Sequence, residues 1–138
     1  MKLESVFLID DDPINNFVSY AVITRANITK EIVIEGNGKN AMSSLRKYYY
    51  EKESLPEIIF LDLNMPIMDG FEFLQAFNKE FYLLKDKVTI VILTASLNDK
   101  EKEIGSELGV EHFIHKPLSE RAMSAFLNHL NSPILASA

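Results

Sequence analysis

The sequence predicts a single α/β domain built on a parallel sheet that helices cover on both faces, the doubly wound arrangement. Five short apolar runs alternate along the chain with segments whose apolar residues recur at helical spacing. The runs are apolar on both faces, which is typical of parallel strands buried between two helical layers. The chain has 138 residues, 47% hydrophobic and 25% charged, which suits one compact domain with its own core.

A strand at 6–9 and a helix at 13–26 open the predicted fold. The strand is apolar and stops at three consecutive acids. Pro13 suits the first turn of a helix, and Asp12 is favoured as its N-cap. Helical spacing predicts that one stripe of this helix faces the core: Ile14, Phe17, Val18, Ala21 and Val22.

The middle of the chain repeats this alternation. Strands are predicted at 32–34 and 58–61, and the helix between them at 39–51. The inward residues of that helix are predicted to be Ala41, Leu45 and Tyr48. A third helix follows the second of these strands, and its inner side is predicted to carry Phe71, Leu74 and Phe77.

The last third supplies two more strands and two more helices. A strand at 88–93 precedes a helix at 98–108, which Gly109 ends. A fifth strand contains Phe113 and Ile114, and a last helix at 119–130 carries an apolar stripe of Met123, Phe126, Leu127 and Leu130. We therefore predict a domain over residues 1–131 and a loose tail over 132–138.

Composition argues against several classes of protein. The chain has no cysteine, so it has no disulfide, thiolate metal site or cysteine nucleophile, and we expect a cytoplasmic location. A net charge of −6 without a basic run argues against binding to nucleic acid. No apolar stretch approaches the ~18 residues of a membrane span, and the N-terminal residues do not resemble a signal peptide.

The unusual polar residues fall where predicted strands end. Asp10 and Asp11 follow the first strand, Asp62 the third, Thr94 the fourth and Lys116 the fifth. Ligands of open parallel sheets bind at this carboxyl edge. Clustered carboxylates repel one another unless a cation intervenes, and oxygen ligands suit Mg²⁺ or Mn²⁺.

This set of groups suits phosphoryl transfer. A divalent cation, a lysine and a hydroxyl can bind the charged oxygens of a phosphoryl group. A carboxylate as the attacking group would give an acyl phosphate. The segment GNGKN at 36–40 lacks the upstream glycine and the Ser/Thr of a phosphate-binding loop, so we expect the donor to come from another molecule.

Four motifs resemble the receiver domain of two-component response regulators, related to the chemotaxis receivers. They are FLIDDDP at 7–13, FLDLNMPIMDG at 60–70, ILTA at 92–95 and IHKP at 114–117. They occur in the family's order and at the same strand ends, and the resemblance covers about residues 4–130. It implies a flavodoxin-like sheet with strand order 2-1-3-4-5 and five helices.

The resemblance also implies roles for the acidic residues. Asp62 matches the phosphoacceptor. Asp11 matches the direct metal ligand, and Asp10 acts partly through water. Asn64 is expected to offer its backbone carbonyl to the metal, which would be Mg²⁺, with Mn²⁺ as a substitute.

Three further residues match positions that respond to phosphorylation. Thr94 is expected to bind a phosphoryl oxygen, and Lys116 to pair with the phosphoaspartate through a loop shaped by a cis bond to Pro117. Phe113 matches the aromatic switch position, together with Thr94. Many family members have tyrosine there, so a hydrogen bond from that hydroxyl is lost here, while the change of rotamer is still expected.

The function implied is that of a single-domain response regulator and not an enzyme, with at most slow self-phosphorylation and self-dephosphorylation. A sensor histidine kinase or a histidine phosphotransfer protein would phosphorylate Asp62. The surface formed by the fourth helix, fifth strand and fifth helix would then change. No effector domain follows residue 130, so we expect a separate effector protein to receive the signal.

Two other functions stay open at the sequence level. Asp10 and Asp12 have the Asp-x-Asp spacing of phosphatases that form an aspartyl phosphate, although Ile14 stands where that motif has Thr or Val. The chain is also short for a substrate-capping domain. The other alternative is an interaction module that works without phosphorylation, against which the intact acidic residues argue.

Several other features have ordinary structural interpretations. Asp69-Gly70 is typical of a turn, and the charged run at 99–103 is typical of a solvated helix face. Three histidines have no metal-ligand spacing and are expected to be surface or packing residues: His112, His115 and His129.

Overall fold

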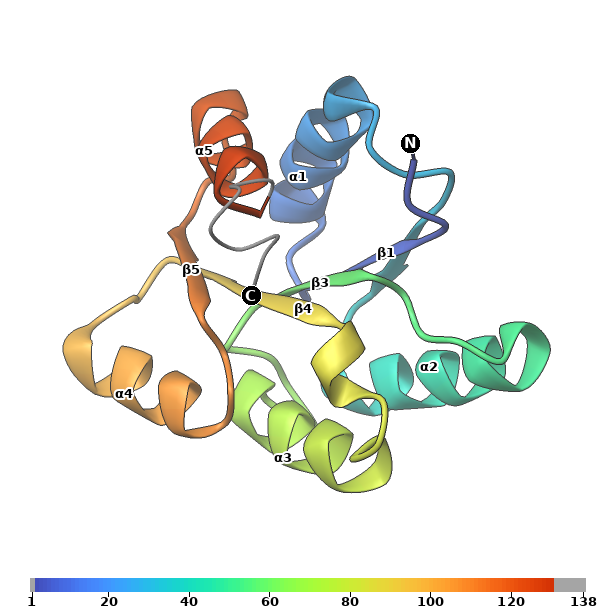
Figure 1. Ribbon diagram of the computed structural model, residues 1–138. Helices are drawn as coiled ribbons and strands as arrows, with labels where there is room; N and C mark the ends of the chain where they lie inside the picture. Colours follow the sequence, from blue (N-terminus) through green and yellow to red (C-terminus); the bar gives the residue numbers. More distant parts are fainter. Residues whose placement is uncertain (1, 131–138) are drawn as a thin grey trace.

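The computed structural model describes residues 2–130 and contains one parallel sheet (Figure 1). In chain order the strands are β1 (Val6–Ile9), β2 (Ile32–Glu35), β3 (Ile58–Leu61), β4 (Thr89–Thr94) and β5 (His112–His115). The helices are α1 (Pro13–Ala26), α2 (Gly38–Lys52), α3 (Gly70–Glu80), α4 (Asp99–Glu107) and α5 (Glu120–Leu130), with a short 3₁₀ helix, η1 (Lys85–Lys87), before β4. The order β2-β1-β3-β4-β5 confirms the predicted fold.

The helices form two layers, one on each side of the sheet (Figure 1). Helices α1 and α5 cover one face, and α2, α3 and α4 cover the other. Successive strand residues alternate between these layers, so Phe7 packs toward α2 and α3 while Leu8 packs toward α1 and α5. Both side chains are buried, as a sheet covered on two faces requires.

The layer on the α2–α3 side is rich in aromatic side chains. Phe73 and Phe77 of α3 and its C-cap Phe81 pack in a row, with successive ring centroids 5.9 and 5.5 Å apart. Leu74 and Phe77 are buried as predicted, Phe71 is only half-buried, and Phe73 is an additional core residue. Burying each such side chain contributes about 1.5–3 kcal/mol to folding.

The predicted inward stripe of α1 is largely wrong, although Val22 does pack against the core. Ile14 and Phe17 are 74% and 77% exposed, whereas Ser19 and Ile23 are buried against the sheet. Apolar residues occur on nearly all sides of this helix, so their spacing does not select one face. Asn16 fixes the rotation, because its side-chain amide donates a 2.8 Å hydrogen bond to the carbonyl of the residue that follows β1.

Residues with known capping preferences determine where several helices begin and end. Asp12 caps α1 as predicted, with its carboxylate accepting from the backbone N–H groups of residues 14 and 15. Asp69 was predicted to lie in a turn, but it is the N-cap of α3 and forms a capping box with Glu72. Gly109 follows α4 with a φ of +94°, a conformation that glycine adopts readily.

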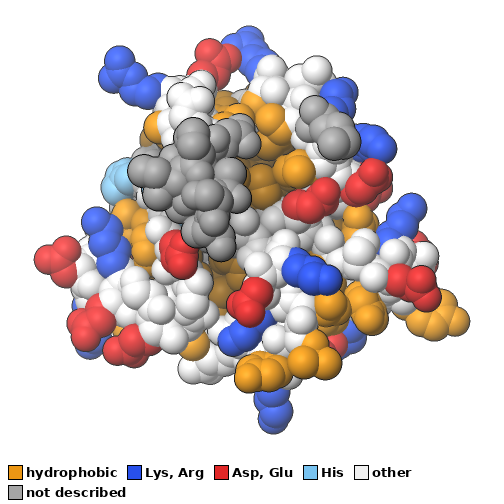
Figure 2. Space-filling model, in the orientation of Figure 1, with side chains coloured by type: hydrophobic (Ala, Val, Ile, Leu, Met, Phe, Trp, Pro, Cys, Tyr) orange, Lys and Arg blue, Asp and Glu red, His pale blue; other side chains and the backbone are white. Residues whose placement is uncertain are grey.

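Two predictions concern the ends and the surface of the chain. The tail at 132–138 lies outside the described residues, so the domain limits 1–131 stay a prediction. Within residues 2–130, no helix is long and apolar enough to cross a membrane. Figure 2 shows charged side chains of both signs spread around the rim of the molecule, without a broad basic patch on the face drawn.

Candidate acidic metal site

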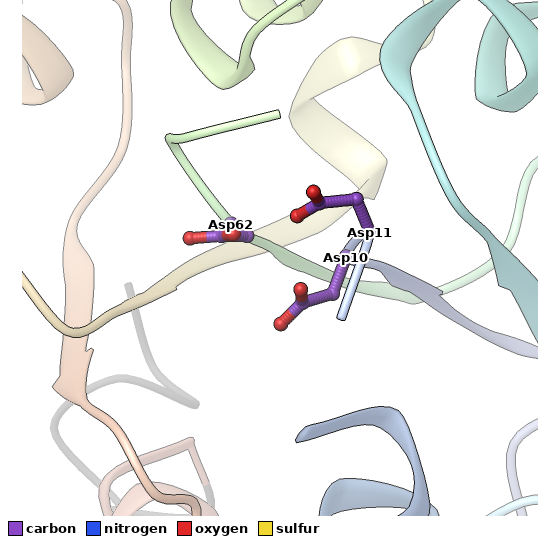
Figure 3. A group of neighbouring side chains, drawn as sticks. All are labelled: Asp10, Asp11 and Asp62. Carbon is purple, nitrogen blue, oxygen red and sulfur yellow. The ribbon is translucent and has the colours of Figure 1, made fainter. Parts of the chain in front are cut away.

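Asp10, Asp11 and Asp62 come together at the carboxyl edge of the sheet (Figure 3). Each offers a carboxylate oxygen, and the three oxygens lie within 4.8 Å of one another. The strand register explains this, because Ile9 pairs with Leu61 in the parallel β1–β3 ladder. The residues that follow these two positions therefore emerge side by side, and the predicted convergence of the three carboxylates is present.

Burial and a single lysine set the electrostatics of this group. Asp10 and Asp62 are buried, while Asp11 is exposed. The Lys116 ammonium lies 2.5 Å from Asp10 Oδ2 and 3.3 Å from Asp62 Oδ2. The Lys116 ammonium contacts two of the three carboxylates, which leaves excess negative charge in the group. That charge and the all-oxygen donor set fit a hard divalent cation.

The pKa values respond to the same contacts. Burial raises the pKa of Asp62, and the charge of Asp10 raises it further, while Lys116 opposes both. Burial alone would lower the pKa of Lys116, but its hydrogen bond to Asp10 and the charges of Asp10 and Asp62 outweigh burial and raise it. The lysine therefore stays charged at neutral pH.

Thr94 and Lys116 meet at the ends of β4 and β5. Thr94 is the last residue of β4 and is fully buried. Its carbonyl accepts a 2.9 Å hydrogen bond from the backbone N–H of Lys116, which fixes the two residues as neighbours. The Lys116–Pro117 peptide bond is cis, as expected.

Sequence reasoning missed a hydrogen-bond chain that starts at this site. The Asn64 amide donates to Ser96 Oγ at 3.0 Å, and Ser96 Oγ lies 3.4 Å from Thr94 Oγ1. Ser96 Oγ also donates to Glu101 Oε2 at 3.3 Å. Glu101 completes the capping box of α4 with Asn98, so its carboxylate is not simply on a solvated face as predicted. The Asn-x-x-Glu spacing at 98–101 was the available signal.

Gly70 allows α3 to begin directly beneath the acidic group. A Cβ at Gly70 would lie 2.5 Å from the carbonyl oxygen of Asp62 and 2.8 Å from Leu63 Cα. Both neighbours are backbone atoms that cannot move aside cheaply. The Asp69-Gly70 pair therefore combines a helix cap with a close backbone approach, and both features hold the loop after Asp62.

Phe113 lies further along the same edge, on the α4 side of β5. It is half-buried, and a Cβ at Gly105 of α4 would come within 2.9 Å of its ring. The small residue lets α4 pack closely on the ring. The switch role assigned to Phe113 stays a prediction, as do the individual roles of the other site residues.

Comparison with known proteins identifies the family of this chain. The model of the response regulator receiver domain matches residues 6–128, nearly the whole chain. The chain belongs to the response regulator receiver family. A receiver is a phosphoacceptor signalling module and not a classic enzyme. The aspartate triad is typical of the divalent-metal site of receivers.

Individual relatives share the fold over most of this receiver. A two-component response regulator from Cytophaga hutchinsonii is 31% identical, with a TM-score of 0.85 covering 96% of this chain and 100% of that one. The Mn²⁺-bound form of response regulator Rcp1 is 26% identical, with a TM-score of 0.71 covering 98% and 96%. "Probable transcriptional regulator ycf27" of Porphyridium aerugineum is 29% identical over 126 residues, which are 91% of this chain and 47% of the relative. This chain thus spans about half the length of the curated relatives that it matches.

Proposed function

We propose that Asp62 accepts a phosphoryl group in a reaction that depends on Mg²⁺, or on Mn²⁺ in its place. The observation that carries this proposal is the position of the Asp62 carboxylate. It is buried, within 4.8 Å of two other carboxylates, and 3.3 Å from the Lys116 ammonium. Asp10, Asp11, Asp62 and the backbone carbonyl of Asn64 would hold the ion. The Mn²⁺-bound form of the relative Rcp1 supports a divalent cation as the ligand.

The transfer is a direct displacement at phosphorus. An oxygen of Asp62 forms a bond to phosphorus while the bond from phosphorus to the donor's imidazole nitrogen breaks. The nitrogen keeps the electron pair and takes a proton from solvent. A bound divalent cation supplies charge neutralisation at the phosphoryl oxygens. Lys116 pairs with the product, and the Thr94 hydroxyl donates to a phosphoryl oxygen.

The signal passes through the elements beside Thr94. Movement of the Thr94 hydroxyl toward the phosphoryl group disturbs its contact with Ser96, which also hydrogen-bonds Glu101 at the start of α4. Phe113 then turns inward, and the surface of α4, β5 and α5 changes. A separate effector protein binds this surface in one of its two states.

The donor is a sensor histidine kinase or a histidine phosphotransfer protein. Such a protein must reach the mouth of the acidic site. Two large apolar side chains on α1, Ile14 and Phe17, are exposed close behind the Asp12 cap. Ile67, in the loop that follows Asp62, is 75% exposed. These exposed side chains, on α1 and on the loop after Asp62, provide apolar area for the donor to bury.

Acetyl phosphate labelling of the full chain tests the assignment, read by intact mass. We expect one phosphoryl adduct with Mg²⁺, none with EDTA, and none on Asp62→Asn. Asp86→Asn is the matched control, because Asp86 is an exposed aspartate in η1, away from the site. Full labelling of Asp62→Asn would refute the assignment. Failure of the wild type to bind Mg²⁺ would instead favour a module that works without phosphorylation.

A further inference from the structure

A chain of hydrogen bonds joins the loop after Asp62 to the first turn of α4. Asn64 lies two residues after Asp62, and its side-chain amide donates to Ser96 Oγ at 3.0 Å. Ser96 Oγ donates in turn to Glu101 Oε2 at 3.3 Å. The other oxygen of this carboxylate, Glu101 Oε1, accepts from the backbone N–H of Asn98 at 3.3 Å. One serine hydroxyl therefore links the acidic site to the start of α4.

The hydroxyl of Thr94 lies against the same serine. Thr94 is fully buried, and its Oγ1 atom is 3.4 Å from Ser96 Oγ. A serine hydroxyl has one proton to donate and two lone pairs that can accept. Since an ionised carboxylate only accepts, the proton of Ser96 goes to Glu101, and Thr94 must be the donor in its contact with Ser96. The proton of Thr94 is thus committed to Ser96 in the unphosphorylated chain.

We propose that Glu101 is a positioning residue that holds the Thr94 hydroxyl in its resting orientation. Glu101 acts through Ser96, because it fixes the direction of the hydrogen bonds at that hydroxyl. The inference rests on the proposed phosphorylation of Asp62, in which Thr94 donates to a phosphoryl oxygen. The Thr94 proton must leave Ser96 for that step, so Glu101 opposes formation of the phosphorylated state.

The variant Glu101→Gln reverses the direction of these hydrogen bonds and keeps the helix cap. Glutamate and glutamine both serve at the third position of a capping box, so the side-chain carbonyl of the variant still accepts from Asn98. The amide nitrogen of glutamine donates to Ser96 Oγ, which a carboxylate cannot do. Ser96 then accepts from two amides and gives its own proton to Thr94. The Thr94 proton becomes free to bind a phosphoryl oxygen.

Loss of charge at position 101 is a second effect that the experiment must separate. Acetyl phosphate is an anion, so removal of a nearby carboxylate also reduces its repulsion from the acidic site. Glu103→Gln is the matched control, because Glu103 is exposed and carries the same charge on the same helix. Ser96→Ala provides a second control. An effect of charge persists without the serine hydroxyl, whereas an effect transmitted by hydrogen bonds disappears.

The rate of labelling by acetyl phosphate with Mg²⁺, read by intact mass on the full chain, tests the proposal. Glu101→Gln should be labelled at least about threefold faster than the wild type, because a hydrogen bond made only in the resting state is lost. Glu103→Gln should match the wild type. Ser96→Ala and the double variant Ser96→Ala/Glu101→Gln should be labelled at equal rates. An unchanged rate in Glu101→Gln, an equal gain in Glu103→Gln, or a gain that persists without Ser96 would overturn the proposal.

A second measurement needs no phosphoryl donor and therefore separates this inference from the proposed function. In the metal-free chain, Glu101→Gln should shift the NMR resonances of Thr94 and of the Asn64 side-chain amide, whereas Glu103→Gln should not. The melting temperature of Glu101→Gln should equal that of the wild type, because the capping box is kept. A wild type that is not labelled would refute the proposed function. Unshifted resonances of Thr94 in Glu101→Gln would refute the role of Glu101.

Discussion

The helices on the two faces of the sheet differ in how completely they bury their apolar side chains. On the α2–α3 side, Phe73, Phe77 and Phe81 pack on one another inside a closed aromatic layer. On the other side, α1 buries few side chains and leaves Ile14 and Phe17 in solvent. The α2–α3 side (the closed side) has the larger buried cluster, whereas the α1–α5 side (the open side) has a smaller one and exposes apolar area on α1. Substitutions on the two sides should therefore separate stability from partner binding.

The largest effect is expected on the closed side. Phe77→Ala removes a fully buried ring that contacts two other phenylalanines. We expect the free energy of unfolding to fall by about 3–5 kcal/mol, from lost burial and the cavity left behind. Urea denaturation followed by circular dichroism measures it. A loss below about 1 kcal/mol would mean that this layer is not the main source of stability.

A gain in stability is expected in the loop after Asp62. Ile67 has a φ of +70° and a side chain that is 75% exposed. A left-handed backbone costs a residue with a Cβ about 1–2 kcal/mol, and glycine avoids this cost while losing about 0.5–1 kcal/mol to its freer unfolded state. Ile67→Gly should therefore raise the free energy of unfolding by up to about 1 kcal/mol. Ile67→Ala keeps the Cβ and should show no such gain; a less stable glycine variant would contradict this.

A smaller change in stability is expected for α1. Phe17→Ala alters an exposed side chain, so the free energy of unfolding should change by no more than about 0.5 kcal/mol. Phosphotransfer from the cognate kinase should slow, because the donor loses an apolar contact. Labelling by acetyl phosphate should be unchanged, since that donor needs no docking surface. Unaltered kinase transfer would show that α1 does not contact the donor.

The smallest expected effect is a pH dependence of stability that comes from His112, on β5 at the edge of the open side. The pKa of His112 is lowered by burial and by His129, against the opposing charge of Glu111. His112 thus takes up a proton less readily in the folded state than in the unfolded state. The free energy of unfolding therefore falls as pH drops below about 6.5. Between pH 7.5 and 5.5 the melting temperature of the wild type should fall further than that of His112→Gln. Equal falls would mean that His112 does not contribute.

The sequence predicts the sheet and the acidic group well, for a physical reason. Strands β1, β3 and β4 are largely apolar and are followed by, or end at, a polar residue of the site, so strand ends and site residues coincide there. The rotation of α1 could not be predicted, because its apolar residues surround the helix and the hydrogen bond of Asn16 decides the inward face. Ser96 was missed because its contact with Asn64 joins two separate loops and depends on the three-dimensional path of the chain. The capping role of Glu101 could have been predicted from the Asn-x-x-Glu spacing at 98–101.

The contact of Lys116 with Asp10 joins the end of the last strand to the end of the first. The lysine reaches its place only after β5 has docked on β4, so the acceptor pocket is complete only in a fully assembled sheet. If Asp62 accepts a phosphoryl group as proposed, a chain without β5 would lack the Lys116 ammonium beside Asp10 and Asp62 and would be a poor substrate. Pulse labelling with acetyl phosphate during refolding should then appear only after β5 has joined the sheet.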